Sequence, residues 1–220
     1  MQAKKYTALS KMRSVMEITI KERTKDISFE EIAKLVRKAY SVWDEKGYDY
    51  AARNYTAEDI ERVSKGGTVL IALADGKAVG TLIYYLGRKY KDLGTVNSVH
   101  SHIAAVLPEY KGNRIGRMLF EKMFTDAKKA GCGEYVGDTC AENKQLLEWY
   151  KRMGCEVVSY TSFPNTSYYS AVFLKPLNNK YSKAFYISHR IKGWIKTHLL
   201  YNADGSYRMP GRLLRKLKNI

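Results

Sequence analysis

The chain has 220 residues, of which 38 are Lys or Arg and 22 are Asp or Glu, so its formal net charge is +16 at pH 7. Hydrophobic residues make up 45% of the chain, which favours one packed domain with an extension. The sequence has no run of about 18 apolar residues that would span a membrane. Its N-terminus has no apolar segment of a secretory signal. The three cysteines lack C-x-x-C spacing, which argues against a disulfide framework or a zinc site and indicates the cytoplasm.

The first half of the chain predicts a strand, two helices and a hairpin. Residues 1–14 are polar and basic and are expected to form a lead-in, and Val15 to Ile20 fits a first strand. Ser28 begins a capping-box pattern in front of apolar residues at helical spacing, and Thr56 begins a second, shorter one. Residues 68–86 predict two strands joined at Asp75-Gly76, a common hairpin turn.

The second half alternates strands with helices. A loop at Gly87 to Gly94 is expected to precede a long strand. The whole pattern predicts an α/β fold with a mixed sheet. The later elements are expected at 96–107 (strand), 115–130 (helix), 134–138 (strand), 143–153 (helix), 155–160 (strand) and 168–174 (strand).

A basic, glycine-containing loop lies between the long strand and the helix at residue 115. The first N–H groups of a helix have no partner within it, and the helix dipole adds positive charge, so this loop predicts an anion site. Gly112 and Gly116 allow a ligand to come close to the main chain. On spacing alone, a helix start that is simply capped is the alternative. The loop also matches neither common nucleotide-binding glycine pattern.

Two segments together resemble a known family. Residues 106–119, VLPEYKGNRIGRML, resemble the acetyl-CoA loop of the GCN5-related N-acetyltransferases (GNAT), V-x-P-x-[YF]-[RQ]-G-x-[GR]-[IL]-G-x-x-L. Lys111 stands where Arg or Gln is usual, and Arg114 where the first Gly of the shorter pattern, [RQ]-x-x-G-x-[GA], is usual. Residues 143–155, NKQLLEWYKRMGC, resemble the family's segment N-x-x-[AL]-x-x-[LFW]-Y-x-x-x-G-F, with Cys155 in place of Phe. The resemblance covers about residues 15–175.

The resemblance implies a GNAT-like, mostly antiparallel central sheet flanked by helices, and acetyl transfer from acetyl-CoA to a primary amine by direct attack. It implies an N–H donor for the developing oxyanion from a strand bulge around Ala105 to Leu107. Tyr150 matches the family's general acid, although a tyrosine on an amphipathic helix also fits a plain core aromatic. The implied cofactor-binding residues are Ala105, Val106, Leu107, Lys111, Gly112, Asn113, Arg114, Ile115, Gly116, Arg117 and Asn143.

Two histidines are the candidates for the general base that takes the proton of the amine. Strict alternation along the long strand places His100, His102, Ala104 and Val106 on one face, and a histidine has a suitable pKa. Either histidine also fits a plain hydrogen bond in the sheet. The family often has a Glu at about this place, and none occurs between residues 96 and 108. A two-histidine metal site is rejected because no further ligand lies nearby in the sequence, so no metal is expected.

The resemblance places the amine acceptor, a small molecule or a peptide, between the first two helices and the late strands. Tyr48, Tyr50 and Tyr55 are therefore candidate substrate-binding residues, as is the segment Phe163 to Tyr169. Packing of these tyrosines within loops is the alternative. The identity of the acceptor, the acyl chain length and the oligomeric state are not readable from the sequence.

Residues 176–220 form a basic extension that the resemblance does not cover. From Lys175 onward there are eleven Lys or Arg residues and a single acidic residue, Asp204. Apolar residues recur at helical spacing from Ile187 to Leu199, and a second short helix fits Gly211 to Leu217. Residues 183–218 suit an anionic membrane surface, which would make a cytoplasmic protein peripheral to the membrane. The favoured alternative packs this stripe on the domain. Nucleic acid is the least favoured partner, because no recognised motif accompanies the charge.

The leading hypothesis is thus an acetyl-CoA-dependent N-acetyltransferase with a basic helical extension. One rival keeps the fold and binds acyl-CoA without turnover. A second rival is an adaptor for a membrane surface or nucleic acid that acts through the basic tail.

Overall fold

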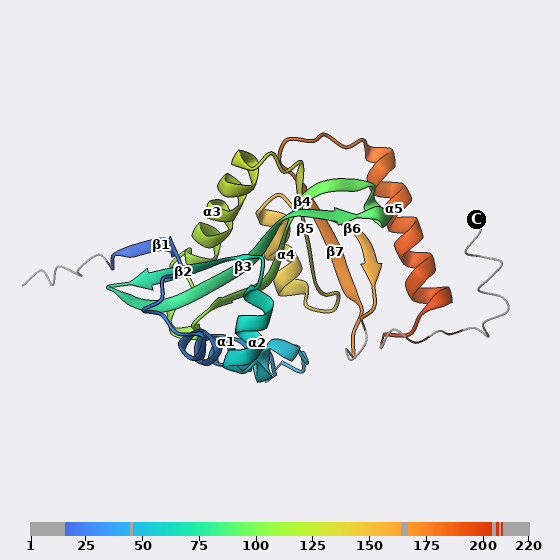
Figure 1. Ribbon diagram of the computed structural model, residues 1–220. Coiled ribbons are helices and arrows are strands. Elements are labelled where there is room, and N and C mark those ends of the chain that lie inside the picture. Colours follow the sequence, from blue (N-terminus) through green and yellow to red (C-terminus); the bar gives the residue numbers. More distant parts are fainter. Residues whose placement is uncertain (1–15, 45, 164–166, 204–205, 207, 209–220) are drawn as a thin grey trace, which may run out of the picture.

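A computed structural model of the chain describes residues 16–44, 46–163, 167–203, 206 and 208 (Figure 1). Residues 1–14 and the helix predicted at Gly211 to Leu217 lie outside the described residues.

Seven strands form one twisted sheet in the order β1-β2-β3-β4-β5-β7-β6. All neighbouring strands are antiparallel except β4 and β5, which are parallel. The predicted mixed, mostly antiparallel α/β sheet is therefore confirmed. The strands are β1 (Ile18–Glu22), β2 (Thr68–Ala74), β3 (Lys77–Tyr90), β4 (Thr95–Val106), β5 (Glu134–Cys140), β6 (Glu156–Thr161) and β7 (Ser170–Pro176).

Helices cover both faces of the sheet and one of its edges (Figure 1). α1 (Phe29–Asp44) and α2 (Ala57–Ser64) bury one apolar core against β2, β3 and β4. α3 (Ile115–Lys129) and α4 (Lys144–Arg152) bury a second core on the opposite face. α5 (Lys183–Ile195) continues into a π-helical turn at Lys196–Leu200 and packs beside β6. Short 3-10 turns occur at Ala51–Asn54, Lys91–Leu93 and Pro108–Tyr110.

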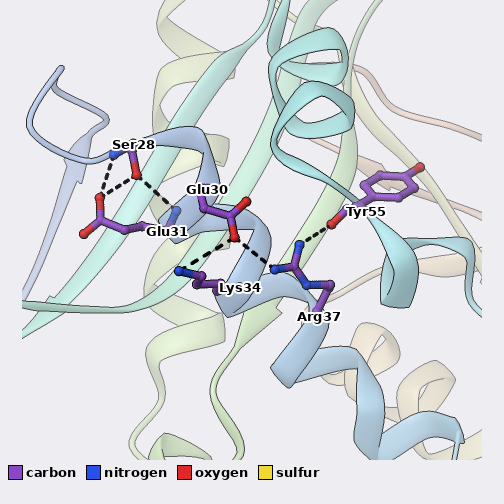
Figure 2. Close-up of polar contacts among 6 residues, drawn as sticks. All are labelled: Ser28, Glu30, Glu31, Lys34, Arg37 and Tyr55. Carbon is purple, nitrogen blue, oxygen red and sulfur yellow. Dashed lines mark hydrogen bonds and ion pairs between the residues drawn. The ribbon is translucent and has the colours of Figure 1, made fainter.

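Both predicted capping boxes form. At the start of α1, the main-chain N–H and the hydroxyl of Ser28 donate to the Glu31 carboxylate, and Ser28 Oγ accepts from the Glu31 N–H (Figure 2). These bonds lower the pKa of the Glu31 carboxyl. Farther along α1, Arg37 donates to Glu30 and to the main-chain carbonyl of Tyr55 at 2.7 Å, which ties α1 to the segment before α2 (Figure 2).

Several strand boundaries differ from the prediction, most of them by one or two residues. β1 ends at Glu22 rather than Ile20, because its pairing with β2 runs on to Glu22 opposite Leu70. β3 runs to Tyr90, so the first half of the loop expected at Gly87 to Gly94 is strand, and only a short turn remains before β4.

β4 contains one irregularity that overturns an expectation. Its register with β3 is regular from Val106 back to Ile103 and then shifts, with Ser101 opposite Tyr84, so the extra residue is His102. The prediction of a bulge around Ala105 to Leu107 is therefore wrong, because the bulge lies at His102.

The bulge also changes which side chains share a face. Ala104 and Val106 pack with the core under α3, and so does Val99, which strict alternation would put on the other face. The prediction that His100 shares a face with Ala104 and Val106 is therefore wrong. An inserted residue reverses the alternation beyond it.

β4 and β5 pair over only three residues, from Ser98 opposite Glu134 to His100 opposite Val136. Beyond this point β4 continues to Val106 and β5 to Cys140, but the two strands no longer pair with each other. The paired end is fastened by the fully buried Glu134 carboxylate, which accepts from the hydroxyl of Ser98. It also accepts from Asn179 Nδ2 and the Tyr181 hydroxyl, each at 2.6 Å.

α5 packs beside β6 through one aromatic residue and two small ones. Tyr186, Gly193 and Thr197 are buried on its inner face. Its large apolar residues point outward instead, and Ile187, Ile191 and Trp194 are each more than half exposed. The expectation that this apolar stripe packs on the domain is therefore wrong, because the close approach at Gly193 turns the stripe away from the sheet.

Gly193→Ala is expected to lower the free energy of unfolding by about 1–2 kcal/mol. A Cβ at this position would lie 2.6 Å from the main-chain nitrogen of Tyr160, and overpacking of this kind costs more than the alanine gains in helix propensity. Denaturant unfolding would measure the loss. Lys192→Ala, at an exposed position on the same helix, is the control and should change stability by less than about 0.5 kcal/mol. A stabilised Gly193→Ala protein would show that α5 does not pack this closely.

Candidate active site

A cavity of about 960 Å³ opens where β4 and β5 part. Its walls are Ser101 to Val106 of β4, Asp138 and Thr139 of β5, and residues from α1, α3 and α4. Since β5 does not pair with this part of β4, the β4 main chain faces a cavity there instead of a neighbouring strand. The parallel strands thus create a ligand-sized opening at their carboxyl ends.

The first turn of α3 borders one end of the cavity. Arg114, the residue before α3, makes no side-chain capping bond, whereas Ser28, Thr56, Asn143 and Ser182 cap the other described α-helices. The N–H groups of the first turn of α3 are therefore available to an anion.

This end of the cavity is strongly basic. Five cationic side chains line it, and Asp138 is the single acidic residue among the described lining residues. This charge suits a polyanionic ligand such as the phosphates of coenzyme A. The five cationic residues are Lys46, Lys111, Arg114, Arg117 and Arg152.

The end of α1 reaches across to α4 beside this basic region. Lys46 Nζ and Lys111 Nζ lie 5.0 Å and 5.2 Å from the centre of the Trp43 ring. Lys46 also donates to Gln145 Oε1 at 3.0 Å, which links α1 to α4. Partial burial and the nearby Lys46 lower the pKa of Lys111.

Most of the expected cofactor-binding residues line the cavity. Leu107, Asn113 and Asn143 do not. The Asn143 side chain instead accepts from the Leu146 N–H at the start of α4 and donates to the Tyr50 hydroxyl at 3.1 Å. The expected residues that do line it are Ala105, Val106, Lys111, Gly112, Arg114, Ile115, Gly116 and Arg117.

Aromatic side chains form the other end of the cavity. The Tyr50 ring lies 5.7 Å from that of Tyr40 and 5.6 Å from that of Tyr168, centre to centre. The Tyr50 hydroxyl lies 3.1 Å from Thr139 Oγ1, and burial raises its pKa. Tyr55 also lines the cavity, whereas Tyr48 does not and instead donates to the Glu142 carbonyl at 3.2 Å.

The two candidate histidines are in different environments. His102 lines the cavity. His100 does not, and its Nδ1 lies 3.0 Å from the carbonyl oxygen of Val136. Although solvent reaches the His102 ring through the cavity, the surrounding protein lowers its pKa by desolvation, with a smaller contribution from His100.

Asp138 is a site residue that sequence reasoning missed. Burial raises the pKa of its carboxyl, while a hydrogen bond from Ser170 and the nearby His102 act in the opposite direction. A carboxylate within an otherwise uncharged buried strand segment, YVGDTC, was the signal that could have revealed it. Tyr40 and Trp43 were also missed as site residues, because both belong to helix α1, where they fit plain core positions. Phe163 and Tyr168 of the candidate segment Phe163 to Tyr169 do line the cavity, and residues 164–166 lie outside the described residues.

Tyr150 reaches the cavity from α4. Its ring stacks on Phe173 with 4.1 Å between ring centres, and the side chain is otherwise buried. Burial raises the pKa of its hydroxyl well above the usual value, so the phenol stays protonated at neutral pH.

Comparison with known families identifies the chain. The sequence model described as the acetyltransferase (GNAT) family matches residues 29–155. The chain belongs to this family. It is an acetyl-CoA-dependent N-acetyltransferase. A search of curated protein sequences returns no match.

Several solved structures have the same fold. The ribosomal-protein-S18-alanine N-acetyltransferase of Escherichia coli aligns with a TM-score of 0.57 and 14% identity, over 76% of this chain and 98% of that one. PaiA N-acetyltransferase of Thermoplasma acidophilum, solved with coenzyme A, aligns with a TM-score of 0.56 and 18% identity, over 73% and 99%. A GNAT acetyltransferase of Elizabethkingia anophelis with acetyl-CoA bound aligns with a TM-score of 0.55 and 15% identity, over 73% and 98%.

Within the described residues, no three His, Cys, Asp or Glu residues gather as a metal site would require. No helix in the same part of the chain has the length and apolar character needed to cross a membrane.

The backbone conformation at Arg114 allows a test of one departure from the family pattern, the arginine in place of the usual glycine. The Arg114 backbone is left-handed, with φ 61°, a conformation that glycine adopts without strain. Arg114→Gly should therefore be more stable than Arg114→Ala by about 0.5–1 kcal/mol in denaturant unfolding. Both variants should bind acetyl-CoA about tenfold more weakly by calorimetry, because both lose the guanidinium. Unchanged affinity in both would remove Arg114 from the cofactor site.

Proposed function

We propose that this N-acetyltransferase acetylates a cationic primary amine, with the amine held at the aromatic end of the cavity and coenzyme A at the basic end. The observation that carries the proposal is the separation of charge in the cavity. Five cationic side chains line it near α3 and α4, and Asp138 is the acidic residue among the described lining residues. The basic end attracts phosphates, and the carboxylate attracts an ammonium group.

Coenzyme A is expected along the unpaired stretch of β4, with its pyrophosphate at the first turn of α3. Support comes from the uncapped start of α3 and from the family. The Arg114 and Arg117 guanidinium groups and the Lys111 ammonium are the charged partners proposed for the phosphates.

The main-chain N–H of Val106 is the proposed donor to the developing oxyanion. The Leu107 N–H donates to Val79 on β3, so by alternation the N–H of Val106 points to the opposite side, toward the cavity. The Ala104 main chain already bonds the Tyr40 hydroxyl. This leaves Val106 as the N–H donor, and such a donor typically contributes about 3 kcal/mol to transition-state stabilisation.

The reaction needs three proton transfers. The amine nitrogen forms a bond to the thioester carbonyl carbon, and the carbon–sulfur bond breaks. Asp138 is proposed to take one proton of the ammonium group before the attack, with His102 as its neighbour in the cavity. Tyr150, protonated at neutral pH, is proposed to give its proton to the leaving thiolate, and the second proton that the nitrogen loses as the amide forms restores the Tyr150 phenol.

The acceptor end favours a cation for two reasons. Tyrosine rings present electron-rich faces, and an ammonium group beside such faces gains about 0.5–2 kcal/mol. Tyr50, Tyr40 and Tyr168 provide these rings next to Asp138. An acidic amine would meet both the carboxylate and the negative ring faces, and is expected to be a poor acceptor.

Thiol release from acetyl-CoA tests the function. A panel of amines should include a linear aliphatic diamine, an amino sugar, a peptide with a free N-terminus and an acidic amino acid. Cationic amines should release thiol at least tenfold faster than the acidic amino acid, and Tyr150→Phe should lower this rate with little change in acetyl-CoA affinity. Tight acetyl-CoA binding without thiol release for any amine would instead support an acyl-CoA-binding domain without turnover.

Asp138→Asn is expected to separate activity from stability. The variant should lose about 10²–10⁴-fold in kcat at pH 7.5, because it lacks the proton acceptor. It should also be more stable than wild type at that pH. A carboxyl whose folded-state pKa is raised stabilises the fold below its unfolded pKa, and this contribution is lost as the pH rises through the folded pKa.

The measurement is denaturant unfolding of both proteins at pH 4 and pH 7.5, beside the rate profile. The stability gain of Asp138→Asn should be larger at pH 7.5 than at pH 4. Ser170→Ala is a matched variant, because it removes a hydrogen bond to Asp138 and keeps the carboxylate. Wild-type turnover in Asp138→Asn would exclude Asp138 as the base.

A further inference from the structure

The outer face of α5 carries a continuous apolar stripe. Ile187, Ile191 and Trp194 are 53%, 55% and 53% exposed, and Ile195 and Leu199 extend the row at 39% and 44%. At 3.6 residues per turn these positions fall on one side of the helix. They are five of the eight large hydrophobic side chains that are exposed in the described part of the chain, so the exposure is concentrated on one element.

The stripe has basic residues along both of its sides. Helical spacing places Lys183 and Arg190 on one side and Lys192 on the other, and all three side chains are exposed. Residues 177–203 contain no Asp or Glu. Glu156 on the neighbouring strand β6 interacts with Tyr186, which belongs to the packed face of α5 and not to the stripe.

This combination decides what kind of partner fits. A second copy of the chain would bring two basic flanks together, and like charges oppose that contact. An anionic lipid surface supplies both an apolar layer for the stripe and negative headgroups for the flanks. A tryptophan in the stripe suits the depth at which apolar chains meet headgroups.

We propose that α5 is a docking site for an anionic membrane surface. The helix lies flat on the lipid surface, with Ile187, Ile191 and Trp194 inserted at the level of the acyl boundary. Lys183, Arg190 and Lys192 contact the headgroup phosphates. The occupant is a lipid bilayer rather than a folded protein.

The position of α5 suits this role. It lies at the outer edge of the sheet beside β6, on the far side of the molecule from β1 (Figure 1). Its end is joined to the acceptor end of the cavity, because the Tyr169 hydroxyl donates to the Tyr201 carbonyl at 2.9 Å, next to the cavity residue Tyr168. Lipid bound to α5 would therefore lie close to the segment that borders the acceptor.

Vesicle flotation with the full chain tests the proposal. Vesicles of phosphatidylcholine alone are compared with vesicles that also contain about 30 mol% phosphatidylglycerol. The protein should float with the anionic vesicles and at least tenfold less with the neutral ones. Ile191→Ser combined with Trp194→Ser should lower anionic-vesicle binding at least tenfold, and Lys192→Gln about fivefold.

Two controls separate the effect of the stripe from that of other exposed apolar residues and from loss of folding. Val96→Ser changes an exposed apolar residue of β4, 73% exposed, and should leave vesicle binding unchanged. Acetyl-CoA affinity, measured by calorimetry, should be unchanged in every variant, which shows that each one is folded.

Three results would overturn the proposal. The first is no flotation with anionic vesicles. The second is undiminished flotation of the Ile191→Ser, Trp194→Ser variant, which would assign lipid binding to another basic segment. The third is a dimer in light scattering that this variant abolishes while wild-type protein fails to bind vesicles, which would make the stripe a contact between two copies.

Discussion

The parting of β4 and β5 is the constraint on which the rest of the site depends. These strands pair for only three residues, and the buried Glu134 carboxylate fastens them at that end. Because they are parallel, the helices that follow them, α3 and α4, both begin at the open end. The start of α3 and Tyr150 of α4 therefore reach one cavity from separate parts of the chain. A fully paired β4 and β5 would leave no unpaired main chain facing that cavity.

Charge within the cavity has opposite consequences for binding and for stability. The cationic residues near α3 are exposed to solvent, so water screens their mutual repulsion. Asp138 lies deeper, and burial raises the pKa of its carboxyl although a hydrogen bond and His102 act against the shift. A buried carboxylate of this kind costs folding free energy at neutral pH. A carboxylate with this cost fits the proton-accepting role proposed for Asp138, since packing alone would favour an apolar residue.

Local sequence signals predicted the elements, but not the side on which particular residues lie. Ser28, Thr56 and the glycine-containing loop at Gly112 to Gly116 act over a few residues, so their patterns correctly indicated helix starts. The inserted residue at His102 leaves no mark in the composition of β4, and it reversed the face of His100 relative to Ala104. Asp138 was missed because its local signal, a carboxylate in a buried strand, does not show that a cavity opens beside it where β4 and β5 part.

The orientation of α5 shows how a small residue can outweigh a periodic pattern. Burying Ile187, Ile191 and Trp194 would have required the helix to turn by about a third of a rotation. Such a turn would replace Gly193 with a larger side chain at the contact with Ser159 and Tyr160, where a Cβ at Gly193 would already lie within 3 Å of neighbouring atoms. Close packing of Gly193 and Thr197 therefore fixes the rotation, and the large apolar residues remain outside. The hydrophobic pattern predicts that α5 is a helix, whereas the packing of its smallest residue determines which face meets solvent.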